Sequence, residues 1–205
     1  MTTETLNNHR IDFKMSPRDL INIGIFGAIY IVTIGIFNAL EFIGPAMTLV
    51  SSWASIIAAG VPFMLFLTRV KHPGMVTVFA VIVNGFMLLI GSPPVTLVIG
   101  LVAAAVAEAV LYAGRYRSRK LSVIAYAVFS TWFAGLFFPM YYARQDFLTS
   151  PYMKGMGDDY VRQLDTLLSP TVLAAFDVST LLFGLIGGAL GLRLMNKHFR
   201  KAGLV

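Results

Sequence analysis

The stretch LINIGIFGAIYIVTIGIFNAL, residues 20–40, is 21 residues long and contains no charged side chain. At 1.5 Å per residue, a helix of this length measures about 30 Å, the thickness of the hydrocarbon core of a bilayer. The stretch therefore predicts a transmembrane helix. Further apolar stretches of similar length follow at residues 46–68, 74–90, 94–113, 121–142 and 171–195.

The composition of the whole chain points the same way. Hydrophobic residues make up 57% of the 205 residues and charged residues 13%, whereas soluble domains have roughly 45–50% and about 25%. Short gaps between the apolar stretches favour one compact bundle. We therefore predict an all-α integral membrane protein: a single membrane domain over residues 1–205 that forms a six-transmembrane-helix bundle.

The distribution of Lys and Arg predicts the orientation of this bundle. Of the 16 such residues, only Arg144, Lys154 and Arg162 fall on the side of the membrane opposite the N-terminus. Positive residues concentrate in cytoplasmic loops, so the N-terminus and the C-terminus are both predicted to be cytoplasmic. Topology then explains the net charge of +6, and we expect no nucleic-acid partner.

The chain lacks the motifs of familiar enzymes. It has no Walker phosphate loop, no HExxH, no GxSxG and no Cys. We therefore expect no catalytic residues, no metal site, no covalently bound cofactor and no ATP binding on this chain. Transport driven by ATP would need partner subunits.

Polar and aromatic residues toward the outer ends of the predicted helices are candidates for ligand binding. Ionisable residues at membrane depth are costly and often mark functional sites, and Asp177 lies inside the last apolar stretch. Aromatic rings could stack on a planar ligand. The predicted ligand-binding residues are Asn38, Glu41, Trp53, Asn84, Trp132, Tyr141, Tyr142, Arg144, Asp146 and Asp177.

Each of these residues also has a structural explanation. Asp177 could cap the start of its helix, and Asn84 could join two helices by a hydrogen bond. The tyrosines could form an aromatic belt at the membrane surface, and the tryptophans could pack between helices. Glu108, the other acid inside an apolar stretch, is expected to pair with Arg115 or Arg117.

Small residues spaced four apart predict close helix contacts. Gly24 and Ala28 form such a pair on the first stretch, where a partner protein or another helix of this chain could dock. The last stretch carries two pairs that favour internal packing, Gly184 with Gly188 and Gly187 with Gly191.

The long gap at residues 143–170 is predicted to lie outside the membrane. Within it, Tyr160, Val161, Leu164, Leu167 and Leu168 are spaced to share one face of a helix. We expect an amphipathic segment there that covers the outer end of the bundle, with a plain tether as the alternative.

Four longer stretches are distinctive: DLINIGIFGAIY (19–30), GVPFMLFLTRVKHPGMVTV (60–78), AYAVFSTWFAGLFFP (125–139) and GGALGLRLMNKHFRKAG (187–203). They resemble the Trep_Strep family of bacterial membrane proteins, among the substrate-binding (S) components of energy-coupling factor (ECF) transporters. The resemblance covers nearly the whole chain.

This resemblance implies a plasma-membrane protein that captures a scarce small molecule from outside the cell. The expected partners are membrane lipid, a transmembrane T component and two cytoplasmic ATPase subunits, against which S components topple to deliver the ligand. S components dock through an Ala-x-x-x-Ala-like surface on the first helix, and Gly24 and Ala28 would occupy that place. Gly24 departs from the family's alanine.

The residues themselves restrict the ligand only loosely. The predicted outer face is acidic and lacks His, which favours a neutral or cationic ligand over a polyanion. The vitamin, cofactor and metal-chelate classes, haem included, all stay open, although a haem would need Met or Tyr as its axial ligand. Two other functions also stay open: an intramembrane enzyme, and a structural or assembly protein without a ligand.

Overall fold

The computed structural model describes residues 15–70 and 72–198, and every regular element in them is helical. The two termini that were predicted to be cytoplasmic lie outside these residues. The long elements are α1 (Pro17–Asn38), α2 (Pro45–Leu67), α3 (Met75–Leu89), α4 (Pro94–Ala113), α5 (Arg119–Ser130) and α10 (Pro170–His198). The short elements are η1 (Ala39–Ile43), η2 (Thr131–Leu136), α6 (Pro139–Tyr142), α7 (Arg144–Leu148), α8 (Pro151–Met156) and α9 (Asp158–Leu167).

Proline marks the start of several of these helices, because its missing N–H needs no partner there. The helices α1, α2, α4 and α10 begin at Pro17, Pro45, Pro94 and Pro170. In front of α1, Ser16 accepts a hydrogen bond from the Asp19 N–H at 3.3 Å, and Asp19 accepts one from the Ser16 N–H at 2.8 Å. Local chemistry therefore defines where these helices begin.

Four segments of the described residues are long and apolar enough to cross a membrane: Pro17–Ile43, Pro45–Leu67, Pro94–Ala113 and Pro170–Asn196. The expected helix at residues 74–90 is present as α3, but its 15 residues span only ~22 Å at 1.5 Å per residue. The expected helix at residues 121–142 is broken into α5, η2 and α6. Over residues 15–70 and 72–198 the fold is therefore all-helical, with four helices of full spanning length.

The break after α5 has a visible cause. Ser130 and Thr131 donate their hydroxyls back to the Ala127 and Val128 carbonyls at 2.8 and 2.7 Å, which competes with regular helical bonding. One turn later, Gly135 meets α4 so closely that a Cβ there would lie 2.7 Å from the Thr96 Cα. The tighter η2 lets the chain pass this contact.

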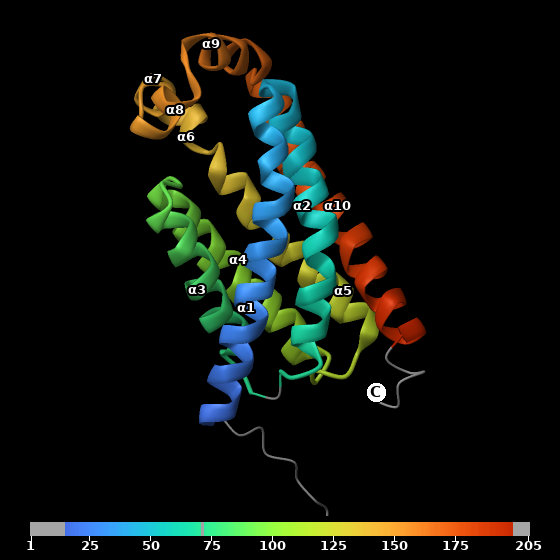
Figure 1. Cartoon of the computed structure of the whole chain (residues 1–205). Coiled ribbons are helices and arrows are strands. Elements are labelled where there is room, and N and C mark those ends of the chain that lie inside the picture. The colour runs from blue at the N-terminus through green and yellow to red at the C-terminus, as the bar shows by residue number, and fades with distance from the viewer. Residues whose placement is uncertain (1–14, 71, 199–205) are drawn as a thin grey trace, which may run out of the picture.

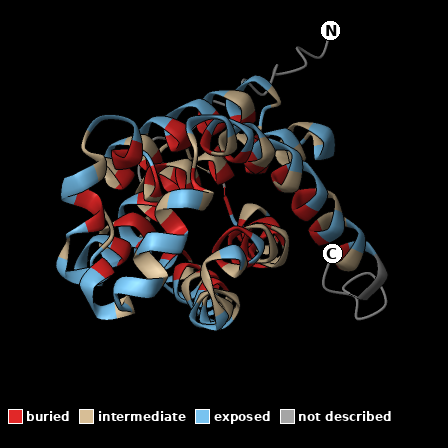
Figure 2. Ribbon diagram, turned by 90° about the horizontal axis from the view of Figure 1, so that it is seen from above, coloured by how far each residue is buried: buried red, intermediate tan, exposed pale blue. Residues whose placement is uncertain are grey.

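The long helices lie side by side (Figure 1). At one end, here called the basic end, α1 and α3 begin and α2 ends. At the other, the capped end, α6 to α9 fold across the bundle; residues 139–168 are here called the cap. Seen from above, buried residues face the interior of the bundle (Figure 2). Large apolar side chains such as Ile36 and Val178 face outward, as expected for helices in lipid.

The glycines of α10 serve internal packing. Gly187 and Gly191 lie against α2, and a Cβ at Gly187 would stand 2.7 Å from the Ile56 carbonyl oxygen. On the other side, a Cβ at Gly184 would stand 2.7 Å from the Ala127 Cα of α5. These close approaches hold α10 between α2 and α5.

Aromatic rings fill the half of the bundle nearer the basic end. Phe63 of α2 stacks on Phe129 of α5 with centroids 4.8 Å apart, and Tyr30 of α1 meets Phe79 of α3 edge-on at 5.3 Å. All four side chains are fully buried. The cross-section is therefore closed in this half.

Glu108 of α4 does not pair with Arg115 or Arg117, so that expectation is wrong. Its carboxylate accepts hydrogen bonds from the N–H of Gly74, from the Thr77 N–H at 3.2 Å and from the Thr77 hydroxyl at 2.7 Å. Gly74 and Thr77 form the N-terminus of α3, where the helix dipole favours a negative charge. Glu108 thus ties α4 to the start of α3.

Candidate functional site

A cavity of about 720 Å³ lies between the cap and the bundle. Its bundle side is formed by α1, η1, α2, α3, α4 and η2, and its cap side by α6 to α9. Trp132 of η2 lines the cavity, is fully buried, and donates its indole N–H to the Tyr30 hydroxyl at 3.2 Å. Trp132 therefore connects the cavity to the aromatic core.

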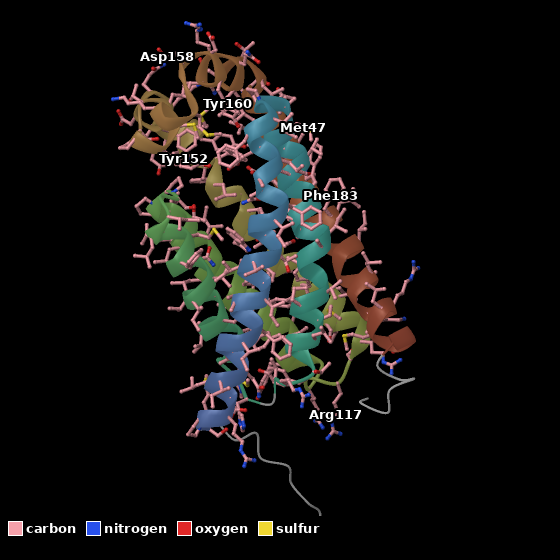
Figure 3. All side chains as sticks on the ribbon, in the orientation of Figure 1. Met47, Arg117, Tyr152, Asp158, Tyr160 and Phe183 are labelled. Carbon is pink, nitrogen blue, oxygen red and sulfur yellow. The ribbon has the colours of Figure 1, made fainter. Side chains whose placement is uncertain are left out.

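The cap closes over the cavity through two hydrogen bonds between side chains. Tyr152 of α8 donates its hydroxyl to Glu41 of η1 at 2.9 Å, and the hydroxyls of Tyr160 of α9 and Thr48 of α2 lie 2.5 Å apart. Figure 3 shows both tyrosines on the side of the cap that faces the bundle. Leu164 and Leu168 at the end of α9 are fully buried.

Arg144 holds the cap together. Its guanidinium donates to the Asp165 carboxylate at 2.6 Å, to the Leu168 carbonyl at 2.9 Å and to the Asp165 carbonyl. These bonds join α7 to the end of α9. The amphipathic face expected within residues 143–170 belongs to α9, whose buried leucines pack onto the bundle.

Polar groups gather on one side of the cavity, where α1 meets α2. Asn38, Glu41, Thr48 and Ser52 line it there. Asn38 accepts a hydrogen bond from Ser55 at 2.9 Å, which orients its amide. The rest of the lining is mostly apolar, and Met87, Met153 and Met156 contribute to it.

The charged residues that line the cavity are all acidic. Glu41 and Asp146 line the cavity, and none of the described residues that line it is Lys, Arg or His. Burial raises the pKa of Tyr152, and the Glu41 carboxylate raises it further; burial and Glu41 also raise the pKa of Tyr160. Both phenols are therefore neutral at physiological pH. Such a lining favours ligands without net negative charge.

Four of the residues predicted to bind a ligand line this cavity: Asn38, Glu41, Trp132 and Asp146. The other six lie elsewhere. Trp53 donates to Ser179 at 2.8 Å and stacks on Phe183 of α10 with centroids 5.2 Å apart, so it packs between helices. Arg144 belongs to the cap.

The remaining four residues also have structural surroundings. Asn84 is 1% exposed, donates to the Ala80 carbonyl at 3.1 Å and abuts Gly100 of α4. Asp177 accepts the Tyr141 hydroxyl at 2.8 Å outside the cavity, and its Oδ1 atom has no hydrogen-bond partner among the described residues. Tyr141 and Tyr142 are exposed, as in an aromatic belt.

Sequence reasoning missed several residues of the cavity, among them Thr48, Ser52, Tyr152 and Tyr160. A signal for two of them was available. Thr48, Ser52 and Ser55 recur at helical spacing in an otherwise apolar helix, and a row of hydroxyls in a membrane helix indicates a polar contact. Tyr160 was predicted only as part of the amphipathic face of residues 143–170, and Tyr152 carried no comparable signal.

The surface of α1 around Gly24 and Ala28 is open. Both residues are exposed, and a Cβ added to Gly24 would meet no atom within 4 Å. This face is therefore exposed on the described part of the chain.

Comparison with known proteins gives one family. Residues 17–201 match the Trep_Strep family, which is described as a hypothetical bacterial integral membrane protein. The chain matches no curated protein and no solved structure. The match covers most of the chain and includes all of its long helices. The chain therefore belongs to the Trep_Strep family of bacterial integral membrane proteins.

Proposed function

We propose that the chain is the substrate-capture (S) component of an ECF importer, a transporter of the ABC type. It binds a small molecule from outside the cell and delivers it by toppling against a transmembrane T component. The observation that carries this proposal is the cavity of about 720 Å³ beneath the cap. Small-molecule sites typically have volumes of about 300–1,000 Å³ and mostly apolar linings with a few polar groups.

The distribution of charge supports the orientation that this function needs. Most Lys and Arg of the described residues lie in the segments of the basic end: Arg18, Arg69, Arg115, Arg117, Arg119, Lys120 and Arg193. The positive-inside rule places such an end in the cytoplasm. The cap and the cavity then face the outside, where an importer meets its substrate.

In the proposed importer, partner subunits would supply the energy for transport. The chain contains no phosphate-binding loop, so two ATPase subunits would hydrolyse ATP and a T component would link them to this protein. The exposed face at Gly24 and Ala28 is the surface on which we expect that T component to dock.

The two alternative functions, an intramembrane enzyme and a structural protein without a ligand, are less well supported. An intramembrane enzyme would need reactive groups brought together, but Glu108 binds the start of α3 while Asp177 binds Tyr141. A structural protein without a ligand would have no need for a lined and capped cavity.

Two measurements test the proposal together. The chain is co-expressed with the T component and ATPase subunits of the same bacterium, and co-purification and ATP hydrolysis are measured. The small molecules that the purified protein retains are identified by mass spectrometry. We expect a complex that hydrolyses ATP and a retained small molecule. A chain that forms no complex and retains nothing would refute the proposal.

A further inference from the structure

The cavity is open on one side, between α1 and α3. The cavity is lined by Val32 and Phe42 of the α1–η1 segment, by Phe86 of α3, and by Ile90 directly after α3. The same side chains are 60%, 71%, 41% and 55% exposed. Side chains that are both lining and exposed form an opening, here called the lateral mouth.

The mouth results from the way in which α1 and α3 diverge. Toward the basic end the two helices touch, since a Cβ at Gly27 would lie 3.5 Å from the Ile82 side chain and Tyr30 packs on Phe79. Toward the capped end α3 leans away from α1 (Figure 1). The cavity fills the space that this divergence leaves.

The α1 side of the mouth belongs to an apolar segment long enough to cross a membrane. Val32 belongs to the apolar segment Pro17–Ile43, and it precedes the end of α1 by six residues, or ~9 Å at 1.5 Å per residue. Its exposed neighbours Ile36 and Leu89 are also apolar. Such a rim is suited to contact with hydrocarbon, not with water.

The water-facing end of the cavity, by contrast, is partly covered: Asp146 and Tyr152 of the cap line it and are themselves exposed. The cap lies over the end of the bundle, held by the Tyr152–Glu41 and Tyr160–Thr48 hydrogen bonds and by Arg144. A ligand that enters through the cap must break these contacts, whereas entry between α1 and α3 breaks none of them.

The interior suits a molecule with two chemical parts. Most of the lining is apolar, while Asn38, Glu41, Thr48 and Ser52 gather where α1 meets α2. The charged groups of the lining, Glu41 and Asp146, are both acidic. The cavity therefore complements an apolar body joined to a polar head that carries no net negative charge.

We propose that the ligand is an amphiphile of this kind, and that it enters sideways from the outer leaflet through the lateral mouth. The capture role in this inference rests on the proposed function; the entry route and the chemistry of the ligand go beyond it.

The chain offers a direct probe of the cavity. It has two tryptophans, and Trp53→Phe leaves Trp132, which lines the cavity, as the only one. In phosphatidylcholine nanodiscs, bromine-labelled quenchers of Trp132 fluorescence are compared: 11-bromoundecyltrimethylammonium, the same head without a long tail (2-bromoethyltrimethylammonium), and the same tail with a sulfate head. We expect saturable quenching by the first only.

The mouth itself is tested by closing it. Because the chain has no cysteine, Val32→Cys and Phe86→Cys can be joined by thiol-cleavable bismaleimides of graded length. We expect loss of quenching by added 11-bromoundecyltrimethylammonium after cross-linking and recovery after reduction. The unreacted double variant is the matched control.

Three results would overturn the inference. One is quenching that persists in the cross-linked protein. Another is saturable quenching by the tail-less head group or by the sulfate. The third is non-saturable quenching equal to that by brominated phosphatidylcholine, which would mean that bulk lipid fills the cavity. A water-soluble retained ligand with an intact ATPase complex would overturn this inference alone, whereas failure of the complex with saturable quenching intact would overturn only the transport function.

Discussion

Gly35 lies on the wall of the cavity at a point where α1 has room for a side chain. It lines the cavity, and a Cβ there would meet no atom within 4 Å. Gly24, on the same helix, is equally open but lies outside the lining. The two glycines therefore form a matched pair for separating ligand binding from other roles of α1.

We expect Gly35→Leu to fill part of the cavity and to weaken ligand binding by about tenfold or more, on the order of 1.4 kcal/mol. Stability should be unchanged or slightly higher, since Gly costs about 1 kcal/mol in a helix relative to good helix formers. The measurement is the amount of small molecule retained on purification, with Gly24→Leu as control. Equal retention by both variants would place the ligand elsewhere.

Glu108 shows how a buried acid can serve structure. Its carboxylate accepts the N–H groups of Gly74 and Thr77 and the Thr77 hydroxyl. We expect Glu108→Gln to lower the free energy of unfolding by about 1–2 kcal/mol, because hydrogen bonds to a charged group are stronger than those to a neutral one. Thermal unfolding in detergent measures this effect. An unchanged melting temperature together with lost ligand binding would instead give Glu108 a functional role.

Among the elements, the cap contains one arginine that joins two of its helices. Arg144 joins α7 to the end of α9 through Asp165 and Leu168. Arg162 offers a contrast on the same cap, because it pairs with Asp159 within α9 and both side chains are largely exposed. Exposed pairs of this kind contribute little to stability.

We expect Arg144→Gln to loosen α9 and to speed hydrogen exchange of its backbone amides roughly tenfold, as the loss of charge-assisted hydrogen bonds would. Arg162→Gln should leave exchange nearly unchanged. Hydrogen exchange followed by mass spectrometry compares the two variants. Similar protection in both would show that the buried leucines, and not Arg144, hold the cap.

For the whole molecule, the proposed function requires a surface on which a partner could dock. Gly24 and Ala28 are exposed on α1, whereas the glycines of α10 pack against α2 and α5. The face of α1 is therefore one exposed small-residue surface on which a partner helix could dock, and bulk there should prevent close approach.

We expect Gly24→Leu and Ala28→Leu to reduce co-purification of the T component severalfold while the retained ligand stays at the wild-type level. Pull-down from membranes that contain all subunits provides the measurement. Gly35→Leu is the reciprocal control, expected to keep the complex and lose the ligand. Wild-type yields of complex from both docking variants would move the docking surface away from this face.

Local features of the chain were sufficient to predict much of the fold. Apolar run length predicted the long helices at residues 20–40, 46–68, 94–113 and 171–195, and spacing predicted the buried leucines of α9. These properties depend on residues a few positions apart, so they can be read without knowing the neighbours. The shortness of α3 and the break after α5 were missed; at the break, Gly135 lies close to Thr96 of α4, a contact between residues far apart in the chain.

The candidate site could be predicted only in part, because its members come from distant points of the chain. Asn38 and Glu41 end the first apolar stretch and were identified as polar groups near a membrane surface. Their partners were not: the Tyr152–Glu41 bond joins residues 111 positions apart, and the Tyr160–Thr48 contact joins residues 112 apart. Apolar length and local spacing place a helix in the membrane, but only packing brings such side chains around one cavity and leaves Asp177 outside it.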